Sequence, residues 1–271
     1  MPTTPATPPS QTPGERAPQA RAPGNSSPPV TLGAYAIVAV AVAVAACVHG
    51  ALGFGLGTIG APVLALVDGD LIPGPLLCVG LVLTLLVASR ERGALDLRGV
   101  RWAIAGRVPG TVVGALAVAL LPQRWLIVVF AVLVLVGVLL SVAGLHVRPT
   151  PRTTFGAGAA SGFMGTVTSV GGPAMALLYQ REDGARLRST LAAFFVFGAA
   201  LSLVSLALAG GLGTREVVLG MAMVPPTLAG FALSAMAARW LDNGRTRSAI
   251  LWFAGLTSAT LLVREVVELV P

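Results

Sequence analysis

Two stretches of the sequence combine glycine, proline and hydroxyl side chains inside otherwise apolar segments. The first, GALGFGLGTIGAP, spans residues 50–62, and the second, SGFMGTVTSVGGP, spans residues 161–173. Glycine interrupts a helix, and an interrupted helix leaves amide N–H groups unpaired. A short helix that starts beyond the break points its positive end into the gap. The two stretches therefore predict a site that binds an anion through backbone amides and hydroxyls.

The predicted site draws on both stretches. Amides around 55–60 would act with one threonine hydroxyl, and amides around 165–172 with three hydroxyls, one of them from Thr166. Both prolines stand where they would open the second limb of a hairpin, a place that favours proline. Close packing of helices is the alternative interpretation of any single glycine. The predicted substrate-binding residues are Gly53, Gly55, Gly57, Thr58, Gly60, Pro62, Gly162, Gly165, Thr168, Ser169, Gly171, Gly172 and Pro173.

Two ionisable residues lie inside apolar segments, where a charge is costly and usually functional. His49 directly precedes the first glycine stretch and could relay a proton or donate to an anion, although a packing histidine is the plainer interpretation. Arg107 precedes Pro109 and could either snorkel to the cytoplasmic face or attract anions in a vestibule. Cys47 and Cys78 lack metal-ligand spacing and are interpreted as small buried hydrophobes. We expect no metal, no cofactor and no catalytic residue.

The composition indicates which elements must position these residues. The chain has 271 residues, of which 55% are hydrophobic and 11% charged, and its mean hydropathy is +0.84. Several charge-poor windows approach the length of about 20 residues that crosses a bilayer. The arginines stand in short loops between these windows, an arrangement that reports membrane topology and not nucleic-acid binding. The sequence therefore predicts an all-α polytopic membrane protein.

Three landmarks recur in the same order along the chain. IGAP at 59–62 returns as VGGP at 170–173, VPGTVVG at 108–114 as VPPTLAG at 224–230, and RWL at 124–126 again at 239–241. This order predicts a duplication. Each half would hold one glycine-interrupted segment, 33–67 or 154–180, followed by three uninterrupted segments. These are expected at 72–89, 102–121 and 125–145 in the first half, and at 189–209, 217–238 and 248–263 in the second.

The arginine distribution decides how the interrupted segments are counted. If each crosses the bilayer once, the loops at 90–101, 146–152, 181–188 and 239–247 divide their arginines six to six between the two sides. If each enters and returns as a hairpin, all four loops and their twelve arginines share one side. The positive-inside rule favours the hairpin. Each half then crosses an odd number of times, so the second repeat is inverted relative to the first.

The domain prediction follows from this count. Residues 1–31 are rich in proline and small polar residues and are expected to form a disordered tail. A first membrane repeat would span 32–145, a cytoplasmic linker 146–153, and a second repeat 154–271. Both termini would lie outside the cytoplasm, and the protein would be a multi-pass protein of the plasma membrane.

The duplicated motifs, GxxGxGxGxxxxP at 50–62 and SGxxGxxxxVGGP at 161–173, resemble those of the TauE/SafE sulfite-exporter family. The likeness covers about residues 32–265. It implies transport of small sulfur-containing anions, such as sulfite, sulfoacetate or other organosulfonates, across the plasma membrane and without an ATPase domain. The first repeat departs from the second by carrying IGAP in place of VGGP, so the halves are expected to contribute unequally.

The expected function is a secondary transporter that exports small anions by alternating access around the two hairpins. A passive anion channel is the alternative, and an intramembrane enzyme a weaker one, because His49 alone makes no catalytic dyad. The expected partners are a small anion and the lipid bilayer, without nucleic acid. A proton could serve as the coupling ion, and the chain could form a homo-oligomer.

Overall fold

A computed structural model of the chain describes residues 32–91, 96–122, 148–179 and 184–241, with single residues between 125 and 139. The predicted tail at 1–31, the segment at 248–263 and most of the segment at 125–145 lie outside the described residues. Every element within these ranges is a helix, as predicted. The elements are α1 (Leu32–Leu52), η1 (Leu56–Gly60), α2 (Ala61–Val67), η2 (Gly69–Leu71), α3 (Gly74–Arg90), α4 (Leu97–Leu120), α6 (Pro151–Thr168), α7 (Gly172–Tyr179), α8 (Gly184–Leu208), α9 (Thr214–Ala222) and α10 (Val224–Leu241).

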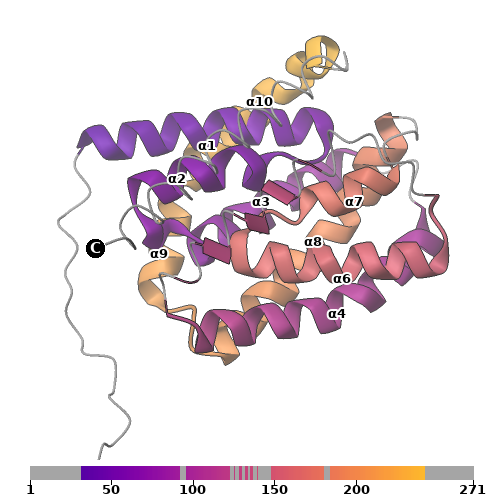
Figure 1. Cartoon of the computed structure of the whole chain (residues 1–271). Helices are drawn as coiled ribbons and strands as arrows, with labels where there is room; N and C mark the ends of the chain where they lie inside the picture. The colour runs from indigo at the N-terminus through magenta and orange to yellow at the C-terminus, as the bar shows by residue number, and fades with distance from the viewer. Residues whose placement is uncertain are drawn as a thin grey trace, which may run out of the picture.

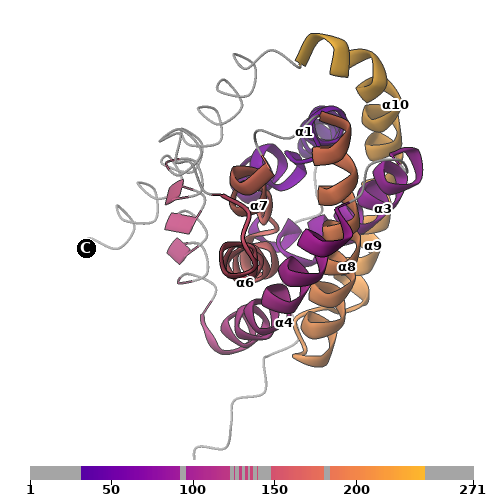
Figure 2. The same ribbon diagram turned by 90° about the vertical axis from the view of Figure 1, so that its right-hand side faces the viewer.

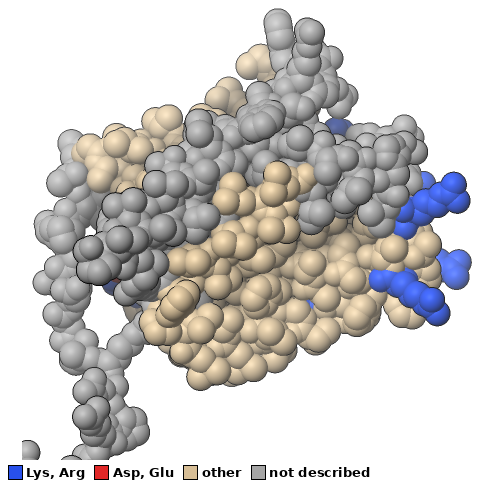
Figure 3. Space-filling model, viewed as in Figure 1, with Lys and Arg blue, Asp and Glu red and all other residues tan. Residues whose placement is uncertain are grey.

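The helices have the length and surface of a membrane protein. Within the described ranges, α1, α3, α4 and α8 are long and apolar enough to cross a bilayer, and the bent pair α9–α10 makes up to five spans. Large apolar side chains stand exposed along them, including Val40, Leu120 and Leu208. Arginine side chains, drawn blue, gather at the right-hand end of the visible face, and the rest of its described surface is almost entirely tan (Figure 3). The predicted class, a helical multi-pass membrane protein, is confirmed.

The first hairpin consists of α1 and the short return helices η1 and α2 (Figure 1). Near its beginning, α1 lies against α9, where the Tyr35 hydroxyl donates to the Ala222 carbonyl. Near its end, the Gly50 carbonyl accepts from the Arg90 guanidinium at the end of α3. The return limb leads back to Asp70, which pairs with Arg215 at 2.7 Å. The hairpin thus enters from the Arg215 end of the molecule and returns to it.

The second hairpin, α6 and α7, has the opposite orientation. Thr150 caps α6 in a capping box with Thr153, at the end where α4 also begins. The break after α6 lies near the start of α3, since the Ser169 hydroxyl donates to the Pro73 carbonyl at 3.1 Å. α7 then returns, and its Tyr179 hydroxyl donates to the N-cap residue of α4. This hairpin therefore enters from the end of the molecule at which α4 begins, and it returns to the same end.

The arginine-rich end is formed by the described residues 90–91, 96–101, 148–152 and 186–188. Glu91 links α3 to α8 at this end, because its Oε1 atom lies 3.4 Å from Arg90 Nε and 3.1 Å from Arg188 Nε of α8. The described parts of three of the four predicted arginine loops therefore meet at one end of the molecule. The fourth loop, at 239–247, falls almost wholly outside the described residues.

The first helix of each hairpin packs along a parallel helix outside the hairpin. α4 lies along α6, and α1 lies along α10 (Figure 2). Glycine permits both approaches. A Cβ at Gly230 would collide with the Ala43 carbonyl of α1, and one at Gly114 would lie 3.0–3.1 Å from Thr166 and the Phe163 carbonyl of α6. Gly114 and Gly230 end the two copies of the repeated VPxTxxG motif, so equivalent glycines fill equivalent places.

The prediction of one uninterrupted segment at 217–238 is wrong. α9 ends at Ala222, α10 begins at Val224, and the two are bent by 41°. Pro225 and Pro226 lack the amide hydrogens that would bond to the carbonyls of the preceding turn, so the helix cannot continue straight. The equivalent stretch in α4 carries the single Pro109, and that helix stays continuous from Leu97 to Leu120.

Candidate functional site

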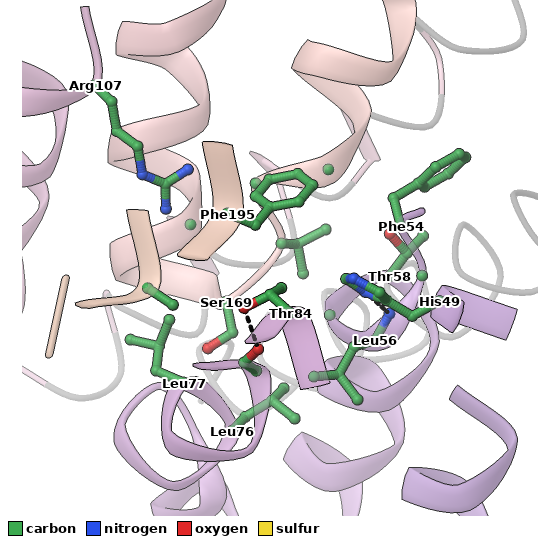
Figure 4. Close-up of a pocket in the computed structure, with 18 residues that line it drawn as sticks. His49, Phe54, Leu56, Thr58, Leu76, Leu77, Thr84, Arg107, Ser169 and Phe195 are labelled. Carbon is green, nitrogen blue, oxygen red and sulfur yellow. Dashed lines mark hydrogen bonds between the residues drawn. The ribbon is translucent and has the colours of Figure 1, made fainter. Parts of the chain in front are cut away.

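A cavity lies where the two hairpins meet. It encloses about 510 Å³ of space outside the protein atoms, open mouth included. Figure 4 shows Arg107 and His49 on opposite sides of it, with the Phe195 ring between them. The wall combines residues of both breaks with residues of α3, α4 and α8. It consists of His49, Phe54, Gly55, Leu56, Gly57, Thr58, Leu76, Leu77, Gly80, Thr84, Arg107, Gly165, Ser169, Val170, Gly171, Gly172, Phe195 and Ala199.

The first break is short and glycine-dependent. Gly53 and Gly55 have φ angles of 85° and 135°, which L side chains rarely adopt. From Leu56 the chain is helical again, as the π-helical turn η1, a form frequent at functional sites. The Leu56 amide donates to His49 Nδ1 at 3.4 Å, which ties the new turn back to α1. The break thus reverses the chain within three residues.

The second break is also short, with irregular backbone only at 169–171. Ser169 is left-handed, with φ of 60°, a strained value for a residue other than glycine. Thr168 caps the turn, because its hydroxyl accepts from the Val170 amide at 3.0 Å. Ser161 holds the turn against α6 by donating to the Gly171 carbonyl at 2.7 Å. Hydrogen bonds from α6 therefore hold both sides of this break.

The two breaks contact each other directly. A Cβ at Gly57 would overlap the Ser169 carbonyl, so only glycine allows η1 to lie this close to the second break. Gly172, at the start of α7, packs against Phe54, which a Cβ would approach to 3.1 Å. Glycine stretches separated by more than a hundred residues in sequence thus form a single wall.

Arg107 is the cation of this wall. Its side chain is 2% exposed, although it lies within a candidate membrane span. One guanidinium nitrogen, Nη1, donates to Ser161 Oγ at 3.2 Å, and the Cζ atom lies 4.8 Å from the centre of the Phe194 ring. Its Nε has no partner, and among the described ion pairs none involves Arg107.

The guanidinium is seated by glycines. A Cβ at Gly198 of α8 would collide with it, and a Cβ at Gly165 would lie 3.1 Å from Nη2. A charged side chain in the middle of a membrane costs about 2.5–3.5 kcal/mol by insertion scales. A cation held at that cost without a carboxylate partner can offset the charge of an anion. The cavity therefore has the electrostatics of an anion-binding site.

His49 is the second polar group with an open position. Its side chain is 6% exposed, and its ring centre lies 6.2 Å from that of Phe195. Nδ1 accepts from the Leu56 amide, whereas Nε2 has no hydrogen-bond partner in the part of the chain that the structure describes. Phe195 also lies 6.0 Å from the Arg107 Cζ atom, so one ring neighbours both polar groups.

The structure brings part of the predicted set to the cavity and places the rest elsewhere. Gly53 lies against the backbone of Arg188, Gly60 against Ala45, and Gly162 against the Arg107 carbonyl. Pro62 and Pro173 open α2 and α7, as expected of the second limb of each hairpin. Thr168 bonds within the break. The predicted residues on the wall are His49, Gly55, Gly57, Thr58, Arg107, Gly165, Ser169, Gly171 and Gly172.

Three expectations need correction. The backbone is not unwound over 55–60 or 165–172, because η1 restores hydrogen bonding at once and α6 stays helical to Thr168. Helical hydrogen bonds are hard to replace at membrane depth, so the breaks are as short as the reversal allows. The Thr166 hydroxyl lies 2.8 Å from that of Ser202 and is absent from the wall. Arg107 does not snorkel, because its side chain is buried.

The sequence reasoning missed the part of the wall that α3 and α8 supply. Leu76, Leu77 and Thr84 come from α3, and Phe195 and Ala199 from α8. Apolar residues in a membrane helix look alike whether they face lipid or a cavity. Gly198 carried a usable signal, because a glycine inside an apolar helix marks a close approach.

A bundle of apolar spans with a cavity between two broken hairpins, lined by a buried arginine, defines a helical multi-pass membrane protein with an internal cavity. A sequence model of the sulfite exporter TauE/SafE family matches residues 37–261, most of the chain. The chain belongs to that family and is a membrane transporter, which confirms the resemblance drawn from the repeated motifs. Comparison with curated proteins and with solved structures finds no match.

Proposed function

We propose that this protein is a secondary transporter that exports small anions, sulfite or organosulfonates, across the plasma membrane. The observation that carries the proposal is Arg107, a buried cation with no carboxylate partner among the described residues, in the wall where the two broken hairpins meet. An anion in the cavity would supply the missing countercharge. His49 Nε2, which has no partner among the described residues, would add a hydrogen-bond donor.

The proposed architecture is a pair of inverted repeats, 32–145 and 154–271, joined by a cytoplasmic linker at 146–153. In this proposal α1 of the first repeat corresponds to α6 of the second, and α4 of the first corresponds to α10 of the second. The parallel packing of α1 with α10 then corresponds to the parallel packing of α6 with α4. The hairpins α1–α2 and α6–α7 enter from opposite ends, as an inversion demands. If the arginine-rich end faces the cytoplasm, both termini lie outside it.

Alternating access would then expose the cavity to each side in turn. Ionic contacts exist at both ends of the bundle. Glu91 lies between Arg90 and Arg188 at the arginine-rich end, and Asp70 pairs with Arg215 at the opposite end. Opening either end would separate helices that these contacts join, while the packed hairpins keep the cavity between them.

A passive anion channel remains the second candidate, because the cavity has an open mouth. Counterflow in proteoliposomes separates the two. Unlabelled sulfite inside the vesicles should accelerate the entry of labelled sulfite through a carrier and leave entry through a channel unchanged. Sulfoacetate, thiosulfate and small carboxylates would define the substrate range. Flux that ignores the internal anion would contradict the transporter.

Coupling is tested in the same vesicles. An imposed proton gradient should drive sulfite against its concentration if a proton is the coupling ion. Equal accumulation with and without the gradient would exclude proton coupling but leave uncoupled exchange. Empty vesicles give the leak that must be subtracted, because the neutral, doubly protonated form of sulfite (hydrated sulfur dioxide) crosses lipid unaided.

A further inference from the structure

The formal charges on the cavity wall are few. Among the described lining residues, Arg107 and His49 are the only ones whose side chains can carry a charge. These side chains come from α4 and α1. The wall parts supplied by η1, α3, α6, α7 and α8 contribute no titratable side chain there. The charge balance of a bound anion therefore depends on two groups.

The hydrogen bonding of His49 fixes which form of its ring the cavity contains. Nδ1 accepts the Leu56 N–H at 3.4 Å, and this contact assigns an unprotonated Nδ1. The neutral imidazole then holds its proton on Nε2, which lies buried without a partner. His49 thus presents an uncharged N–H donor, and Arg107 is left as the single formal charge on the wall.

We infer that the cavity selects monoanions over dianions. This inference rests on the proposed function, since it concerns the charge of the anion that the same cavity carries. One negative charge is offset by the one guanidinium, so sulfite would be carried as the hydrogen sulfite monoanion, and dianions such as sulfoacetate would be disfavoured. A second negative charge would remain unbalanced in a water-poor interior, where an uncompensated charge is strongly disfavoured. Backbone amides stabilise any anion, so they lower the penalty without removing the preference.

The apolar lining of the cavity also favours monoanions over dianions. The remainder of the lining is mostly apolar, with Leu56, Leu76 and Leu77 on one side and Phe195 beside the guanidinium. Figure 4 shows these apolar groups around the space between the two polar ones. A second anionic group on the same molecule would therefore lie against hydrocarbon, whereas an alkyl group would be accepted there.

A matched pair of anions tests the inference. Ethanesulfonate and ethane-1,2-disulfonate share a carbon chain, are fully ionised at any working pH and differ by one charge. The full chain in proteoliposomes should take up the monosulfonate at least 10-fold faster at equal concentration. Equal or faster uptake of the disulfonate would overturn the inference alone. Absence of flux for both sulfonates and for sulfite would overturn the proposed function together with it.

Two variants sharpen the test. Arg107→Gln should reduce ethanesulfonate uptake about 10-fold or more, because the only formal positive charge is removed. Ala199→Lys adds a second cation to the wall and should raise the ratio of disulfonate to monosulfonate uptake. An unchanged ratio in a folded Ala199→Lys protein would contradict charge matching. If that variant does not fold, as size-exclusion chromatography would show, the wild-type ratio and Arg107→Gln still decide.

Discussion

Arg107 owes its position to the residues that make room for it. The guanidinium lies where a Cβ of Gly198 would lie, and it rests on the Phe194 ring. Ser161 accepts one of its N–H groups and donates to the Gly171 carbonyl, so the arginine is linked to the second break through a single side chain. A change at either position should act through the arginine.

Gly198→Ala should therefore displace the guanidinium and weaken anion binding. A charge-assisted hydrogen bond contributes about 1.5–3 kcal/mol, so losing its alignment should raise KM for sulfite by about 10-fold or more. In an Arg107→Lys background the same change should add little, since a lysine has no guanidinium to collide. KM values of the four proteins measure this coupling, and additive effects would show that Gly198 acts independently of Arg107.

The two ring nitrogens of His49 differ in their contacts, and two variants should separate their effects. His49→Ala leaves the Leu56 amide without its acceptor, a loss of about 1–3 kcal/mol of stability. His49→Asn keeps an acceptor near the place of Nδ1 but removes the Nε2 donor. The melting temperature in detergent should thus fall for the alanine variant, whereas KM for sulfite should rise for both variants. A stable alanine variant would mean that the bond to Leu56 contributes nothing.

The sequence was sufficient to find His49, Arg107 and the glycines of the wall, because polar and backbone-exposing residues stand out against apolar segments. It was insufficient for Leu76, Leu77 and Phe195 on α3 and α8. Their orientation is set by the packing of helices far apart in the chain. Only the assembled bundle shows which apolar faces meet a cavity.

At the scale of elements, the meeting of the two breaks is the decisive contact. Both hairpins were predictable, because glycine followed by proline marks a reversal and the motif occurs twice. The length of the irregular backbone in each break was not predictable from the sequence. Helical bonding resumes within a few residues on either side, which compositional reasoning overlooks. The bend at Met223 depends on a second proline, Pro226, that the first repeat lacks.

Gly57→Ala should separate the hairpins, because the added methyl would occupy the place of the Ser169 carbonyl. We expect a loss of about 1–3 kcal/mol of stability, as for overpacking in a core, and reduced sulfite uptake. Gly156→Ala is the matched control, since nothing lies within 4 Å of that position and the residue is exposed on α6. Equal melting temperatures and uptake in both variants would refute the contact.

At the scale of the whole molecule, the two hairpins and the ionic contacts define two ends. Topology is testable with single cysteines in a background without Cys47 and Cys78. Cysteines at Arg98 and Thr150, both exposed at the arginine-rich end, should react with an impermeant thiol reagent only from the cytoplasm. Cysteines at Leu121 and Thr214, which are also exposed, should react only from outside. Labelling of all four positions from one side would contradict the inverted arrangement.

An anion carried against the Arg107 guanidinium is the central element of the proposed transport. Initial rates of labelled sulfite uptake into proteoliposomes test it most directly, with wild type and Arg107→Gln reconstituted at equal density. We expect saturable uptake by the wild type and a ratio of maximal uptake rate to KM that is at least 10-fold lower in the variant. Both proteins should elute at the same volume in size-exclusion chromatography. Saturable uptake at the wild-type rate by a folded Arg107→Gln protein would contradict the proposed role of Arg107.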